Sequence, residues 1–112
     1  MRQVGILAAA GIYAIDNHIP ELKIDHTRAK KLALTLNSIN QEFIKPELVE
    51  TNIVAVNLSV TGRTAGEIAG ELKSNGVLAG ALGKHFLRLV THRDLTDAQI
   101  DETCQILEKI LK

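Results

Sequence analysis

The sequence predicts an α+β fold in which two N-terminal helices precede a β-α-β-β-α unit. This unit is expected to form a small, partly antiparallel sheet of three strands with helices on one face. Three patterns predict the arrangement. Residues 4–15 form an apolar run, residues 22–43 carry apolar side chains at three- and four-residue steps, and residues 54–60 alternate between apolar and small or polar side chains.

The first helix is expected over residues 2–17, around the run "VGILAAAGIYAI". This run is too short to span a bilayer, and its composition predicts a helix that is buried on most sides. The rest of the chain offers few large apolar residues to cover it, so we expect it to need a partner surface outside these residues. The segment "DNHIP", residues 16–20, ends the helix because Pro20 cannot continue a helix interior.

The second helix is expected over residues 21–40. Its apolar stripe consists of Leu22, Ala29, Leu32, Leu36, Ile39 and Phe43. The other side carries Lys23, Asp25, Arg28, Lys30 and Lys31. Such a charged side is typical of a solvated helix face.

The remaining elements have clear boundary signals. A strand over residues 53–60 is followed by "TAGE", a capping box with Thr64 at the N-cap and Glu67 at the third position, which starts a helix ending before Asn75. Strands are expected in "VLAGAL" and "FLRLVTH", residues 77–82 and 86–92, joined as a hairpin. "TDAQ", residues 96–99, is a second capping box. The final helix buries Ile100, Cys104, Leu107 and Leu111.

Composition excludes several classes of protein. The 112 residues include 13 basic and 13 acidic side chains, which cancel, whereas a nucleic-acid or membrane-surface binder shows a basic excess. Cys104 is the only cysteine, so the chain contains no internal disulfide, and a reducing cytoplasmic location is expected. Because Cys104 falls on an apolar stripe, a core position suits it better than a nucleophilic role.

Arg88 is the strongest candidate for a functional residue. It interrupts the apolar strand "FLRLV", and side-chain alternation places Phe86, Arg88, Val90 and His92 on one face. The simpler interpretation is that this face is open to solvent and the arginine lies on it. The alternative is a carboxylate or phosphate clamp, because the planar guanidinium binds two oxygens at once.

Other chemical signatures are weak. The four histidines, His18, His26, His85 and His92, have no metal-ligand spacing, so no metal site is expected. "GRTAGE", residues 62–67, precedes a helix but matches neither phosphate-loop pattern. Neither paired carboxylates nor a Ser-His-Asp arrangement stands out, and we expect no catalytic residue in this chain.

Two stretches carry a family resemblance. "MRQVGILAAAGIYAI", residues 1–15, and "FLRLVTHRDLTDAQID", residues 86–101, resemble the low-specificity L-threonine aldolases. The resemblance covers essentially the whole chain but only the last third or so of a family member. It implies an aspartate-aminotransferase-like fold of the α/β superfamily, pyridoxal phosphate as cofactor, and cleavage of L-threonine or L-allo-threonine to glycine and acetaldehyde. It also implies a homotetramer with sites shared between subunits.

The resemblance assigns roles to two arginines. Arg88 matches the family arginine that binds the substrate α-carboxylate, and Arg2 matches one near the cofactor phosphate. The family's Schiff-base lysine lies upstream of the matching region, and none of Lys23, Lys73 and Lys84 has its context, so the chain alone is expected to be inactive. Residues 1–18 are expected to belong or link to a missing cofactor-binding domain, and residues 19–112 to form a small C-terminal domain.

Two other functions stay open. The segment from Ile53 onward resembles in outline an ACT-like amino-acid-binding regulatory module that lacks a final strand, in which Arg88 would hold a regulatory amino acid. The chain is alternatively a truncated structural subunit that docks on full-length aldolase through its Ala-rich helix.

Overall fold

The computed structural model describes residues 2–112. Its helices are α1 (Val4–His18), α2 (Leu22–Ile39), α3 (Ala65–Ser74) and α4 (Asp97–Leu111). Its strands are β1 (Ile53–Asn57), β2 (Gly80–Ala81) and β3 (Phe86–Val90), and single 3-10 turns occur at η1 (Ile19–Glu21), η2 (Pro46–Leu48) and η3 (Ser59–Thr61). The predicted α+β class and the order of the elements are confirmed.

The sheet has the order β1-β3-β2. Strand β3 is antiparallel to both neighbours, with Ala55 and Gly80 on either side of Arg88. Strands β1 and β2, which α3 connects, therefore run in the same direction, and β3 lies between them and runs in the opposite direction. The sheet predicted to be partly antiparallel is antiparallel throughout the described part of the chain.

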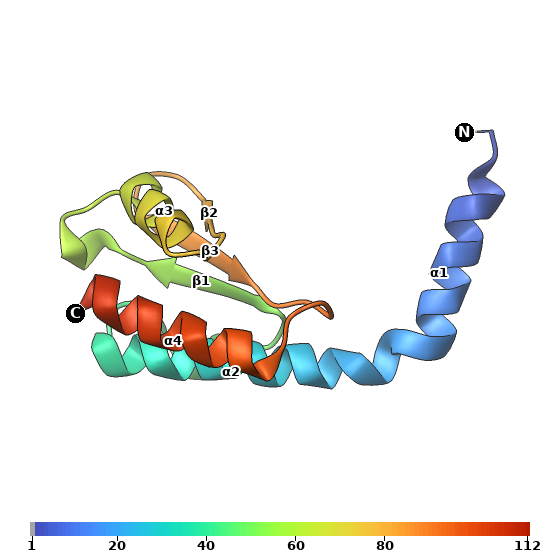
Figure 1. Cartoon of the computed structure of the whole chain (residues 1–112), viewed down its shortest axis with the longest axis horizontal. Coiled ribbons are helices and arrows are strands. Elements are labelled where there is room, and N and C mark those ends of the chain that lie inside the picture. Colours follow the sequence, from blue (N-terminus) through green and yellow to red (C-terminus); the bar gives the residue numbers. More distant parts are fainter. Residues whose placement is uncertain (1) are drawn as a thin grey trace.

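The helices cover one face of this sheet, as predicted. On that face Val54, Val56, Leu87 and Leu89 are buried, whereas their neighbours along each strand are exposed, apart from the half-buried Asn57. Helices α2 and α4 run side by side along the sheet (Figure 1), and α3 contacts β2, β3 and α4. The core between them also contains buried residues of α2, α3 and α4, namely Ala29, Leu32, Ala33, Leu36, Ala65, Ile68, Leu72, Ile100 and Leu107.

Both predicted capping boxes are present. The hydroxyl of Thr64 accepts a hydrogen bond from the Glu67 amide at 3.2 Å, and the Glu67 carboxylate accepts one from the Thr64 amide at 2.7 Å. Thr96 and Gln99 repeat the exchange at 3.2 and 2.9 Å. Two sequence patterns of four residues thus define the starts of α3 and α4.

The two strands flanking α3 are shorter than predicted. The strand expected over residues 53–60 ends at Asn57, and the one expected over residues 77–82 has two residues, Gly80 and Ala81. The amide of Val77 donates to the carbonyl of Leu72 at 2.9 Å, closing the last turn of α3 around Gly76, whose φ is 85°. The start of the segment 77–82 therefore hydrogen-bonds to the end of α3 and does not join the sheet.

Helix α1 differs from the expectation of a helix buried on most sides. Within residues 2–112 none of its residues is buried, and Figure 1 shows it projecting from the rest of the molecule. Its exposed large side chains are Val4, Ile6, Leu7, Ile12, Tyr13 and Ile15. Among the described helices, none is long and apolar enough to cross a membrane.

Part of the charged side of α2 is not solvated as predicted. Asp25 is buried, with 7% of its surface exposed, and the Arg28 side chain is 15% exposed and donates to Asp97 at 2.8 Å. Lys30 donates to the backbone carbonyl of Pro46 at 2.6 Å. The segments that follow α2 and β3 fold back over this side of the helix.

Candidate functional site

Arg88 lies at the centre of the open face of the sheet. It is exposed, and it is flanked along β3 by the exposed side chains of Phe86 and Val90. Ala55 and Ile53 of the neighbouring strand lie on the same face. Within residues 2–112 no hydrogen bond or ion pair engages its guanidinium. The structure therefore places a cation without a partner beside apolar side chains, on a strand that is paired on both sides.

Gly80 provides space for the Arg88 side chain. The two residues are cross-strand partners of β2 and β3. A Cβ atom built on Gly80 would lie 3.7 Å from Nη2 and 3.8 Å from Nε of Arg88. The guanidinium therefore lies against the bare backbone of β2. Sequence reasoning did not single out Gly80, although a glycine inside a strand is a known sign of close approach by another group.

The end of β3 is fixed by Thr91, which is fully buried. Its hydroxyl donates to the carbonyl of Asp25 in α2 at 2.7 Å. Its amide donates to the carbonyl of Asn52 at 2.9 Å, and the side-chain amide of Asn52 donates back to the Thr91 carbonyl at 2.7 Å. These bonds hold the strand of Arg88 against α2, and they explain a polar residue within the stretch "RLVTH".

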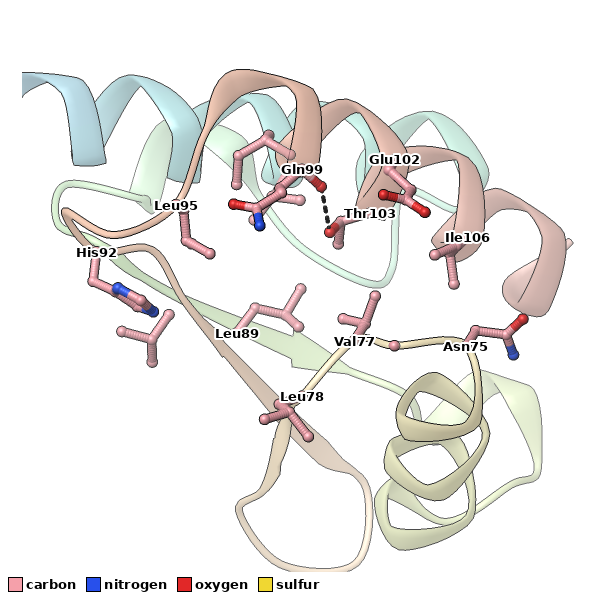
Figure 2. Close-up of a pocket in the computed structure, with 14 residues that line it drawn as sticks. Asn75, Val77, Leu78, Leu89, His92, Leu95, Gln99, Glu102, Thr103 and Ile106 are labelled. Atoms are coloured by element: carbon pink, nitrogen blue, oxygen red, sulfur yellow. Dashed lines mark hydrogen bonds between the residues drawn. The ribbon is translucent and has the colours of Figure 1, made fainter.

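His92 lies two residues beyond the end of β3 at Val90, and the alternation of buried and exposed residues along the strand continues through Thr91 to it. It is exposed, with Nδ1 3.9 Å from a carboxylate oxygen of Asp94. Its ring lies at the edge of a cleft of about 330 Å³ between α4 and the segment after α3, as Figure 2 shows. Arg88 does not line this cleft.

The cleft offers little specific chemistry. Its walls are mixed, with apolar side chains such as Val77, Leu89 and Leu95 beside polar ones (Figure 2). Two of its polar side chains already have partners within α4: Gln99 belongs to the capping box, and the Thr103 hydroxyl donates to the Gln99 carbonyl at 2.8 Å. A selective ligand site needs polar groups that are free to bind the ligand, and these two are already engaged.

Arg2 lies at the opposite end of the molecule. It is exposed in the turn that precedes α1, and no hydrogen bond or ion pair to it occurs in the described part of the chain. Figure 1 shows this end of α1 far from β3. The structure thus does not bring Arg2 and Arg88 together within one chain.

The histidines form no metal-binding group. Among residues 2–112 there is no cluster of three or more His, Cys, Asp or Glu side chains that could hold a metal ion. His18 instead contacts Arg93, and His85 lies 3.4 Å from the carbonyl of Arg63. Cys104 is partly buried against the core.

Comparison with known proteins decides the family. Residues 1–60, which include α1, α2 and β1, match the family of beta-eliminating lyases. The chain belongs to that family. This member of the beta-eliminating lyases is also 30% identical over 112 residues to low-specificity L-threonine aldolase 1 of Arabidopsis thaliana, an alignment that covers 99% of the chain. It is 32% identical over 111 residues to a probable low-specificity L-threonine aldolase 2 of the same plant, and 36% identical over 102 residues to the low specificity L-threonine aldolase of Escherichia coli K12.

The chain spans about a third of the length of these curated relatives, or 31%, 31% and 28% in turn. The alignment with the first covers nearly all of the chain and therefore the strand of Arg88 as well as α1. The resemblance predicted from the two end stretches of this beta-eliminating lyase family member is confirmed.

Proposed function

We propose that this chain is the C-terminal portion of a pyridoxal-phosphate-dependent lyase that cleaves L-threonine or L-allo-threonine to glycine and acetaldehyde. Arg88 binds the α-carboxylate of the substrate. The observation that carries the proposal is the free guanidinium of Arg88 on the open face of the sheet, in a chain similar along its length to named threonine aldolases.

The surroundings of Arg88 suit a carboxylate. The guanidinium presents two parallel N–H donors, which match the two oxygens of a carboxylate. Phe86 and Val90 flank it, and a ligand seated there would displace water from the ion pair and strengthen it. Fixing the carboxylate in one orientation determines how the Cα–Cβ bond of the amino acid is presented for cleavage.

The residues present fit a supporting role toward the cofactor. Arg2 is an exposed cation with no partner among residues 2–112, and it is the residue we expect to contact the phosphate. When bound, pyridoxal phosphate supplies the electron sink for the carbon–carbon cleavage. Lys23, Lys73 and Lys84 are exposed, whereas a nucleophilic lysine needs a desolvated pocket or a neighbouring cation. We therefore expect no cleavage by this chain alone.

The distance between the two arginines supports an assembled enzyme. Since Arg2 and Arg88 lie at opposite ends of one chain, a site that uses both takes them from two copies of the chain. The uncovered apolar surface of α1 is consistent with such contacts. We propose a cytoplasmic homotetramer whose ligand is a small amino acid, with no nucleic-acid or membrane partner.

The test uses substrates with and without a carboxylate. Arg88→Gln is introduced into the full-length enzyme, and kcat/KM is measured for L-threonine and for L-threoninamide. Loss of a hydrogen-bonded charge pair costs about 1.5–3 kcal/mol, so the preference for the acid should fall roughly 10- to 150-fold. The matched control is Arg63→Gln, because Arg63 is paired with Glu71 away from the open face. An unchanged preference in Arg88→Gln rules out the carboxylate role.

A regulatory amino-acid-binding module is the second candidate. The topology β1-α3-β2-β3-α4 with sheet order β1-β3-β2 favours it, since this is an ACT-like unit without a final strand. Calorimetric titration of the chain with L-amino acids in the absence of pyridoxal phosphate separates the two candidates. Saturable binding that Arg88→Gln abolishes supports the regulatory module, and no binding supports the lyase.

A docking subunit is the third candidate, favoured by the exposed apolar side chains of α1. Mixing the chain with a full-length aldolase and measuring the mass of the complexes tests it. Mixed complexes that disappear when Ile12 is replaced by Glu support docking through α1.

A further inference from the structure

The corner between α1 and α2 lacks continuous backbone support. Helix α1 ends at His18, and α2 begins at Leu22 after the 3-10 turn of Ile19, Pro20 and Glu21. Proline has no amide hydrogen to donate, so the ladder of helical hydrogen bonds is interrupted here. Among the described elements α1 contacts mainly η1, and its other residues are exposed. The direction of α1 therefore depends on side chains at the corner.

Arg93 bridges this interruption with two different nitrogen atoms. Its Nη1 lies 2.6 Å from Nε2 of His18, before the proline, and its Nε lies 3.1 Å from Oε2 of Glu21, after the proline. Since a guanidinium can only donate, Nε2 of His18 must accept, and the imidazole proton resides on Nδ1. That Nδ1 lies 3.4 Å from the same Glu21 oxygen. We call His18, Glu21 and Arg93 the corner cluster.

The ring of His18 is held from the α1 side as well. The ring of Tyr13 meets it edge-on, with ring centroids 5.4 Å apart. The His18 side chain is 23% exposed, less than that of its partner Arg93 at 59%. The histidine is thus positioned by its own helix, so that a bond from Arg93 acts on α1 as a whole.

Arg93 itself comes from a segment fastened to α2 on both sides. Two residues earlier, the buried hydroxyl of Thr91 bonds the carbonyl of Asp25. Four residues later, Asp97 accepts a hydrogen bond from Arg28 at 2.8 Å. Because the segment between these bonds is short, Arg93 is a fixed point of the small domain from which the corner is held.

We propose that Arg93 is a positioning residue that sets the direction of α1 relative to the sheet and α2, by bridging the helix break at Pro20 through His18 and Glu21. It thereby links the segment that follows the strand of Arg88 to the helix that directly follows Arg2. The hinge role needs only the corner cluster. The consequence for the two arginines rests on the proposed function.

The alternative is a solvated ion pair of little consequence, which is usual for exposed charges. The two interpretations can be distinguished, because the bridge needs one side chain that hydrogen-bonds His18 through Nη1 while its Nε forms an ion pair with Glu21. Lysine has the same charge but only a single, freely rotating ammonium group. Arg93→Lys should therefore fail to hold the corner if the bridge matters, and should replace arginine if only charge matters.

The test measures the direction of α1 by pulsed electron–electron spin resonance. Nitroxide labels are placed on the exposed positions Ala9→Cys in α1 and Gln105→Cys in α4, in the full chain with Cys104→Ala. Wild type should give one narrow distance distribution. Arg93→Gln and Arg93→Lys should each broaden it roughly twofold or more, because the freed corner samples many directions.

Two further variants sharpen the result. His18→Gln keeps an oxygen that can accept from Arg93 and should retain much of the narrow distribution, whereas His18→Phe removes the acceptor and should not. Arg63→Gln, which breaks an ion pair remote from the corner, is the matched control. A broad distribution in wild type, or one left narrow by either Arg93 substitution, overturns the proposal.

The link to the proposed function is read separately. In the full-length enzyme, Arg93→Gln should lower kcat/KM for L-threonine. A broadened distribution with unchanged kinetics keeps the hinge role and overturns the link between the two arginines. Failure of the carboxylate test for Arg88 leaves the spin-label result unaffected.

Discussion

Gly80 and Arg88 are cross-strand partners, and the guanidinium of Arg88 lies against the backbone of Gly80. The absence of a side chain at Gly80 leaves the space in which the guanidinium rests. Its φ angle is not among the positive ones of the chain, so the position does not need glycine for its backbone conformation. A side chain longer than a methyl group at this position would compete with the guanidinium for this space.

Gly80→Val should therefore weaken substrate binding without unfolding the sheet. A branched side chain occupies the space beside Nη2 and Nε and moves the guanidinium, while valine itself suits a strand. We expect KM for L-threonine to rise roughly tenfold or more, the cost of losing about 1.4 kcal/mol of binding. The measurement is steady-state kinetics of the full-length enzyme together with its thermal melting temperature.

Gly80→Ala is the control for that substitution. A methyl group at this position would make ordinary contacts of 3.7 and 3.8 Å with the guanidinium, so KM should stay close to wild type. Equal KM values for the valine and alanine variants would show that the space over Gly80 has no bearing on Arg88.

Thr91→Val should destabilise the chain by about 1 kcal/mol, because it removes one buried hydrogen bond while keeping the shape of the side chain. The lost bond is the one from the Thr91 hydroxyl to the Asp25 carbonyl. Urea unfolding measures the change. Thr91→Ser keeps the hydroxyl and should lose less than the valine variant. The opposite ranking would mean that packing of the methyl group, and not the bond, matters at this position.

The contribution of Glu67 to the stability of the fold should decrease as the pH falls into the acid range. Hydrogen bonds from the Thr64 backbone and hydroxyl hold the pKa of the Glu67 carboxyl below its ordinary value of 4.5. A carboxyl with a lowered pKa in the folded state stabilises the fold above its unfolded pKa, and this contribution is lost as the pH falls through the folded pKa. The melting temperature of Glu67→Gln should therefore be lower than that of wild type near neutral pH. The two values should approach each other below pH 4.5.

Glu102→Gln is the matched control for that experiment. The Glu102 carboxylate makes no ion pair among residues 2–112, so its replacement should give a difference from wild type that changes little across the same range. A parallel shift of Glu67→Gln and wild type at every pH would contradict the role of the capping carboxylate.

Ile6→Glu combined with Ile12→Glu should reduce association of the chain without lowering its melting temperature. Both side chains are exposed on α1, at 77% and 61%, so they add little to the folded core. Sedimentation velocity over a range of concentrations measures association. Association that is unchanged by two added charges would exclude α1 as the contact surface.

Local patterns in the sequence determined the kinds and order of the elements. The boxes at Thr64 and Thr96 act between residues three apart, and the alternation in β1 and β3 repeats every second residue. Such signals are complete within one element, which is why they predicted the starts of α3 and α4 and the exposed face that carries Arg88. The start of β2 was predicted too early, because the amide of Val77 donates to the carbonyl of Leu72 at the end of α3 and not to the sheet.

The tertiary structure alone decided the contacts between distant segments. It placed Gly80 beside Arg88, buried Asp25 on a helix side that the charges predicted to be solvated, and brought Arg93 to His18 across 75 residues. It also left α1 uncovered. These outcomes depend on which strands pair and where the loops return, and a sequence pattern that repeats every two or four residues carries no information about either.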